Sequence, residues 1–120
     1  MNSQQLLSYH DKGQCWPQAI SSTPGYDINA AYRDALTVRD LRIARGEIPR
    51  GYKIGFTNRT IWTRYNVFGP VWGTVWNTTL TFCSGYQGLS LNGICQPRIE
   101  PEIVFGFKET PKSDATLEDI

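Results

Sequence analysis

The chain has 120 residues, 40% of them hydrophobic and 19% charged, which fits one folded domain and argues against a disordered chain. Twelve basic and eleven acidic residues leave a net charge of +1 without a basic stripe, so a nucleic-acid partner is not expected. No apolar run approaches the ~20 residues of a membrane span, and the first residues lack a secretory signal pattern. Three cysteines without a CxxC pair favour neither a disulfide framework nor a zinc site, so we expect a reduced, cytoplasmic protein.

Two helices are predicted in the first third of the chain. Residues 3–12 form the first, with Ser3 as its N-cap and Gly13 suited to the left-handed backbone beyond its end. Asp27 is expected to cap the second helix, residues 28–45, because its carboxylate can accept the free N–H groups of the first turn. Apolar residues recur there at helical spacing, which indicates a helix that covers a sheet. The stripe comprises Ala31, Ala35, Val38 and Leu41, widened by Tyr32, Leu36 and Ile43.

The rest of the chain has the composition of β-structure. Residues 52–56 form a short strand candidate, and residues 70–82 are rich in Val, Trp and Thr, which favour strands. Between them, Asn58 can cap a helical turn. Residues 98–107 predict a further strand.

Two shorter signals lie in the last third of the chain. Asn92-Gly93 is the dipeptide that most easily adopts a type I′ turn, so residues 89–95 are a hairpin candidate. Residues 116–120 resemble the first turn of a helix, with acids suited to its N-terminal dipole. Together these elements predict one α+β domain.

Glu100 and Glu102 are the first candidates for chemistry. Residues i and i+2 of a strand project from the same face, so the two carboxylates can converge on one cation such as Mg²⁺, which prefers oxygen ligands. Pro101 between them indicates an edge or irregular strand. The alternative is an ordinary solvated strand face.

Lys53 is the second candidate, because it lies in a predicted strand between Gly51 and Gly55. Burial of this lysine would disfavour its charge and make it a proton acceptor, or leave it as a cation for an oxyanion. The alternative is a surface lysine whose charged end reaches water. His10, the single histidine, lies on a predicted surface helix, so a catalytic triad built on it is not expected.

Four segments in this order resemble the 2-oxopent-4-enoate hydratase and 4-oxalocrotonate decarboxylase group of the fumarylacetoacetate hydrolase superfamily. The resemblance covers the chain from about Asp27 to its end, and the second and fourth segments together are its most specific part. The segments are Ala44-Arg-Gly-Glu47, Gly51-Tyr-Lys-Ile-Gly-Phe-Thr57, Gly69-Pro-Val-Trp-Gly73 and Gln96-Pro-Arg-Ile-Glu-Pro-Glu-Ile-Val-Phe105.

The resemblance implies a fold and a set of roles. Residues 1–48 would form an N-terminal helical part, and residues 49–120 the first strands of a mixed, curved β-roll that is incomplete in this chain. Glu100 and Glu102 would bind Mg²⁺ or Mn²⁺, and Lys53 would be catalytic. Gly55 and Thr57, in the lysine motif, would contact substrate. The implied reaction is hydration or decarboxylation of a short 2-oxo or 2-hydroxydienoate acid in the catabolism of aromatic compounds.

The sequence departs from the family pattern in two respects. The family's third metal carboxylate lies in a region with no counterpart in this chain, and Asn77-Thr78-Thr79 supplies no acid where family members often have one. Two other roles therefore stay open: a non-catalytic fragment or degenerate homologue that acts by assembly with a partner chain, and a small-ligand binding domain with an aromatic pocket. A homo-oligomer or a complementing chain is expected, because the missing strands would leave a sheet edge and an apolar face uncovered.

Overall fold

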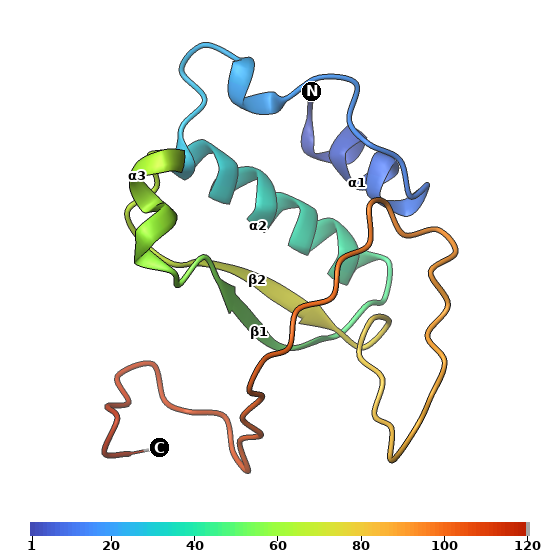
Figure 1. Cartoon of the computed structure of the whole chain (residues 1–120), viewed down its shortest axis with the longest axis vertical. Helices are drawn as coiled ribbons and strands as arrows, with labels where there is room; N and C mark the ends of the chain where they lie inside the picture. The colour runs from blue at the N-terminus through green and yellow to red at the C-terminus, as the bar shows by residue number, and fades with distance from the viewer. Residues whose placement is uncertain (120) are drawn as a thin grey trace.

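The computed structural model describes residues 1–119 and shows helices followed by a small open sheet (Figure 1). The helices α1 (Ser3–Asp11) and α2 (Ile28–Ala44) precede the antiparallel strands β1 (Pro49–Gly55) and β2 (Val71–Trp76). Short helical turns occupy the connections: η1 (Ile20–Ser22), η2 (Arg59–Ile61) and α3 (Trp62–Tyr65). The predicted α+β class and its order, helices before strands, are confirmed.

The helix ends follow local capping chemistry. Asn2, not Ser3 as predicted, caps α1: its side chain accepts from the Gln5 N–H, and the Gln5 side chain accepts from the Asn2 N–H in return. Gly13 follows α1 with a φ of +59°, as predicted for a left-handed helix end. Asp27 caps α2 through a 2.7 Å bond from the Ala30 N–H, which confirms the prediction.

The register of the sheet gives its two faces different roles. Lys53 is opposite Gly73, whereas Ile54 is opposite Trp72, and the register shifts between Pro49 and Gly51. Because side chains alternate along a strand, Lys53 lies on the face opposite to the one that carries Trp72. The same alternation puts Trp72 and Trp76 on one face of β2.

Helix α2 covers the tryptophan face of the sheet, as its apolar stripe predicted. The Tyr32 ring stacks on Trp72 with centroids 5.3 Å apart, and the Tyr32 hydroxyl accepts the Trp72 backbone N–H at 3.1 Å. Tyr52 of β1 meets the same indole edge-on at 5.5 Å. Among the described residues the well-buried side chains are few: Leu6, Leu7, Trp76 and Arg42.

The predicted strand over residues 98–107 is wrong, since that segment has no regular secondary structure. Pro97 and Pro101 cannot donate hydrogen bonds to a ladder, and β1 and β2 pair only with each other. The predicted hairpin over residues 89–95 is also wrong: a single turn forms, in which the Ile94 N–H donates to the Leu91 carbonyl.

The last predicted helix is replaced by a turn. Asp119 accepts from the backbone N–H of Thr116 at 2.8 Å, and its own N–H donates to the Thr116 carbonyl; Ile120 lies outside the described residues. With residues 77–119 largely irregular, the radius of gyration is 16.4 Å, against about 13.6 Å for a compact domain of this length. Within residues 1–119, no helix is both long and apolar enough to cross a membrane.

Candidate functional site

Lys53, Glu100 and Glu102 come together on the sheet face opposite α2. The Lys53 Nζ lies 2.5 Å from an oxygen of Glu102 and 3.0 Å from an oxygen of Glu100. The lysine belongs to β1, whereas both acids belong to the irregular segment after β2, which runs past the two strands (Figure 1). The convergence expected from strand spacing therefore occurs without a strand. Both carboxylates reach a single cation, the lysine ammonium.

The electrostatics of this cluster favour a charged lysine. The side chains of Lys53, Glu100 and Glu102 are 48%, 62% and 39% exposed, so burial does not oppose the ammonium. Hydrogen bonds from Glu102 and then Glu100 raise the pKa of Lys53 above its ordinary value. The arrangement argues against a neutral base. It supports a charged hydrogen-bond donor, and the 48% exposure of its side chain agrees with the alternative of a surface lysine whose charged end reaches water.

Gly55 and Thr57 flank the end of β1 beside this cluster. Gly55 shares the strand face of Lys53, and a Cβ at Gly55 would lie 3.8 Å from the Lys53 Nζ, an ordinary van der Waals contact. A methyl group would therefore fit at Gly55, in contact with the ammonium. Thr57 is exposed just beyond the strand, where its hydroxyl can meet a ligand from solvent.

Phe56 has a conformation that the sequence did not indicate. Its φ is +58°, which is uncommon for a bulky side chain and is typical of functional segments. Two contacts hold it: the Trp62 indole N–H donates to the Phe56 carbonyl at 2.8 Å, and the Tyr65 ring meets the Phe56 ring edge-on at 5.7 Å. The η2–α3 turn therefore fixes the chain direction between Gly55 and Thr57.

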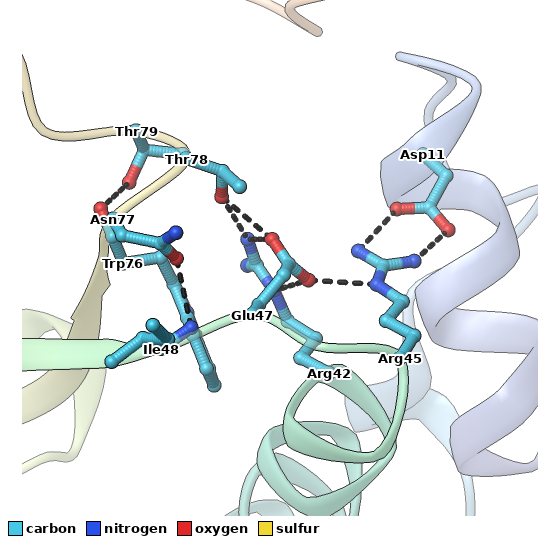
Figure 2. A network of polar contacts seen from close by, with 9 residues as sticks. All are labelled: Asp11, Arg42, Arg45, Glu47, Ile48, Trp76, Asn77, Thr78 and Thr79. Atoms are coloured by element: carbon cyan, nitrogen blue, oxygen red, sulfur yellow. Dashed lines mark hydrogen bonds and ion pairs between the residues drawn. The ribbon is translucent and has the colours of Figure 1, made fainter.

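A second polar cluster joins the end of α2 to both strands and is centred on Glu47 (Figure 2). Arg42 donates to Glu47 from Nε at 2.8 Å and from Nη2 at 2.7 Å. The Thr78 hydroxyl donates to the same carboxylate at 2.6 Å. The Arg42 guanidinium lies 4.4 Å above the Trp76 ring centroid, a cation–π distance. The side chains of Arg42 and Glu47 are each 10% exposed, so this ion pair is nearly dry.

Arg45 extends this cluster to α1. It donates from Nε to Glu47 at 2.7 Å and binds both oxygens of Asp11, at 2.6 and 3.0 Å (Figure 2). These bonds hold the pKa of Glu47 well below its usual value, chiefly through Arg42, and lower that of Asp11 through Arg45. The Ala44-Arg-Gly-Glu47 motif contains two of these residues, but sequence reasoning gave them no role. The hydrogen bonds and ion pairs of this cluster connect α1, α2 and the ends of the strands.

The metal-ligand prediction can be tested for fit against the donor set. Glu100 and Glu102 supply hard oxygen donors that already surround one positive charge, which suits Mg²⁺ or Mn²⁺. Among residues 1–119, no group of three or more His, Cys, Asp or Glu side chains is gathered. Within these residues, Glu100 and Glu102 therefore offer two carboxylate ligands for a divalent ion, and no third ligand of these types lies with them.

An apolar cavity of about 650 Å³ lies on the other side of the sheet. Its walls come from α1, α2, the loop between them and β2, and its polar members are few. It is rich in aromatic side chains: Trp16, Tyr26, Tyr32, Trp72 and Trp76. Because it opens on the helix side, it is separate from Lys53 and its two carboxylates.

No family model matches this chain, but a curated protein is similar to it. The chain is 32% identical over 98 residues to 2-hydroxyhexa-2,4-dienoate hydratase of Comamonas testosteroni. The aligned part makes up 81% of this chain and 37% of that relative, so the chain spans well under half of the relative's length. This similarity supports the hydratase side of the resemblance drawn from the motifs.

Proposed function

We propose that this chain carries Lys53, Glu100 and Glu102 as part of the active site of a metal-dependent lyase. The substrate would be a short 2-oxo or 2-hydroxydienoate acid from the catabolism of aromatic compounds, and the reaction a hydration or a decarboxylation. The observation that supports this most is the meeting of both glutamates on Lys53 Nζ, at 2.5 and 3.0 Å. The similarity to a dienoate hydratase adds independent support for hydration.

Each residue has a defined part in this proposal. Glu100 and Glu102 would hold Mg²⁺ or Mn²⁺, which when bound supplies Lewis-acid polarisation of the substrate ketone. Lys53, kept protonated by its ion pairs, would donate a hydrogen bond to the oxygen that gains negative charge in the reaction. Gly55 would contact substrate beside the ammonium, and the Thr57 hydroxyl would bind the substrate carboxylate.

The ion pairs of Lys53 also predict how metal binding and substrate binding are coupled. In the metal-free chain its ammonium pairs with both carboxylates and offsets one of their two negative charges, so a divalent ion must compete with it. Binding of a 2-oxo acid would draw the ammonium from the glutamates to substrate oxygens and free both carboxylates for the metal. Metal and substrate should therefore bind cooperatively.

The test is Mn²⁺ calorimetry on the whole chain, with and without oxalate as a mimic of the enolate form of the substrate. We expect measurable Mn²⁺ binding that oxalate tightens by at least ~10-fold, and its loss in Glu100→Gln/Glu102→Gln. The matched control is Glu109→Gln/Glu118→Gln, which removes two other exposed acids and should bind like the parent chain. Equal Mn²⁺ affinity in the two double variants would contradict the site assignment.

A second candidate role is assembly with a partner chain or with a second copy. It is supported by the exposure of large apolar side chains next to the two glutamates: Ile99 is 96% exposed, Ile103 83% and Val104 87%. Exposed apolar surface of this kind marks interaction sites. Sedimentation velocity tests assembly with a second copy. A concentration-dependent shift in mass that Ile103→Asp removes supports it, whereas a constant monomer contradicts self-assembly and leaves a different partner chain as the form of this role.

A further inference from the structure

Two cysteines that are far apart in the chain meet at the surface. The sulfurs of Cys15 and Cys95 are 3.1 Å apart, although 80 positions separate these residues. Both residues are exposed, so a soluble oxidant can reach them. A disulfide has an S–S length of about 2.05 Å, so a movement of about 1 Å in flexible side chains would allow the bond to form.

A second contact shows that the backbones themselves meet at this place. A Cβ at Gly13 would overlap the Gly93 carbonyl oxygen and lie 2.6 Å from its carbon, so only glycine fits. Gly13 and Gly93 each precede one of the cysteines by two residues and have positive φ angles of 59° and 76°. The end of α1 and the Leu91–Ile94 turn are therefore docked against each other. This docking, not only two side-chain rotamers, holds the sulfurs together.

We propose that Cys15 and Cys95 form a reversible disulfide that fastens the irregular segment after β2 to the end of α1. In Figure 1 that segment passes close to the end of α1 before it turns towards the strands. Cys95 precedes Glu100 by five residues. Oxidation would therefore anchor the segment directly before the glutamates that contact Lys53. The proposal does not depend on the lyase function.

The reaction needs an oxidant, for which we name a small-molecule disulfide such as oxidised glutathione. The Cys15 thiolate attacks one sulfur of the oxidant, which forms a mixed disulfide and releases one glutathione thiolate. Cys95 then loses its proton and attacks the Cys15 sulfur, which forms the internal disulfide and releases the second glutathione. In total, two protein thiols are oxidised and one glutathione disulfide is reduced to two thiols. Because the thiolate is the attacking form in both steps, oxidation should quicken as pH rises. In the reduced pair the hydrogen bond with Cys15 raises the pKa of Cys95.

The third cysteine gives the inference a sharp internal test. Cys83 lies 12 positions from Cys95, so in an unfolded chain this pair closes a much shorter loop than Cys15 and Cys95. Loop-closure entropy then favours the Cys83–Cys95 disulfide by roughly 17-fold. In the folded chain the docking of Gly13 on Gly93 should reverse that preference.

The experiment is oxidation of the whole chain in a glutathione buffer, once without and once with 6 M guanidinium chloride. After the remaining thiols are blocked, chymotrypsin separates the cysteines by cleaving at Tyr86, between Cys83 and Cys95, and mass spectrometry quantifies each disulfide. We expect Cys15–Cys95 to exceed Cys83–Cys95 by at least ~10-fold in the folded chain and the reverse order in denaturant. Cys83→Ser should leave the folded-state bond intact, and Cys15→Ser should abolish it.

Two results would overturn the proposal. One is a disulfide ratio that is the same with and without denaturant, because the fold would then contribute nothing to the pairing. The other is a folded chain that keeps three free thiols at a glutathione potential at which the unfolded chain is oxidised. A thermal melt gives a second readout: the oxidised Cys83→Ser chain should melt at least ~5 °C above its reduced form.

Discussion

Replacement of Glu47 by glutamine tests whether the cluster around this residue holds the helices to the sheet. The carboxylate accepts four hydrogen bonds: two from Arg42, one from Arg45 and one from the Thr78 hydroxyl. A glutamine has the same shape, but in either orientation its NH₂ group faces guanidinium N–H groups. The substitution thus removes charge and acceptor capacity while it leaves volume unchanged.

The size of the stability loss expected for Glu47→Gln follows from the burial of Arg42. Arg42 is 8% exposed as a whole residue, so Glu47→Gln leaves a nearly buried guanidinium without its counter-charge, for which costs of 3–5 kcal/mol are typical. Arg45 is more exposed, at 37% of its side chain, and keeps Asp11 as a partner, which limits the loss. We expect a decrease of about 3 kcal/mol in the free energy of unfolding.

Urea unfolding measures this change, with intrinsic tryptophan fluorescence as the probe, to which Trp76 next to Arg42 contributes. For a urea dependence of about 1.5 kcal/mol per M, the midpoint should fall by about 2 M. Glu109→Gln, at an exposed acid, is the matched control and should stay within about 0.5 kcal/mol of the parent chain. A loss of less than about 1 kcal/mol in Glu47→Gln would refute the reasoning, because the pair would then behave like a solvated surface salt bridge.

Three further predictions concern the same two clusters. The pKa values of Glu47 and Asp11 are lower in the folded chain than their ordinary values of about 4.5 and 3.8, so their ionised forms stabilise the fold fully above this range. Unfolding measured against pH should therefore show the free energy of unfolding falling as the pH drops through and below this range. The decrease should be smaller in Glu47→Gln. Arg42→Lys keeps the positive charge but loses the bidentate hydrogen bond to the Glu47 carboxylate and the planar stacking on Trp76. Its urea midpoint should therefore indicate a decrease of about 1–3 kcal/mol in the free energy of unfolding. A midpoint equal to that of the parent chain would mean that only the charge matters. Lys53→Met removes the ammonium that competes with Mn²⁺ for both carboxylates. Calorimetry should therefore give Mn²⁺ binding at least as tight as in the parent chain, while hydratase turnover of the assembled enzyme is lost. Weaker Mn²⁺ binding than in the control Lys108→Met would contradict this competition.

The helical part was predictable because its signals are local. Asp27 and Gly46 mark the ends of α2 in the sequence itself, since capping depends only on neighbouring backbone groups. The first strand was predicted over residues 52–56, which overlaps β1 (Pro49–Gly55) but starts three residues late and includes Phe56, whose φ is +58°. The error at Ser3 was a shift of one residue, because Asn2 also has a capping side chain and Gln5 stands at the spacing that completes the reciprocal bonds.

The strand predicted over residues 98–107 shows where local reasoning fails. Its apolar composition favours a strand, but a strand forms only where a neighbour supplies hydrogen bonds, and β1 and β2 already pair with each other. The candidate site shows the opposite case. Glu100 and Glu102 were selected by strand spacing, yet the contact that joins them to Lys53 arises without that strand.

The sequence by itself determined the helix limits, the β1 segment, the near-neutral charge and the motifs that contain Lys53, Glu100 and Glu102. Only the tertiary structure decided which distant residues meet: Glu47 with Arg42 and Thr78, Cys15 with Cys95, and Lys53 with its two acids. The physical reason is the difference in sequence separation over which these interactions act. Capping, turn and periodicity signals act over a few residues, whereas ion pairs and thiol contacts depend on how the chain returns upon itself after dozens of residues, and no local pattern encodes that path.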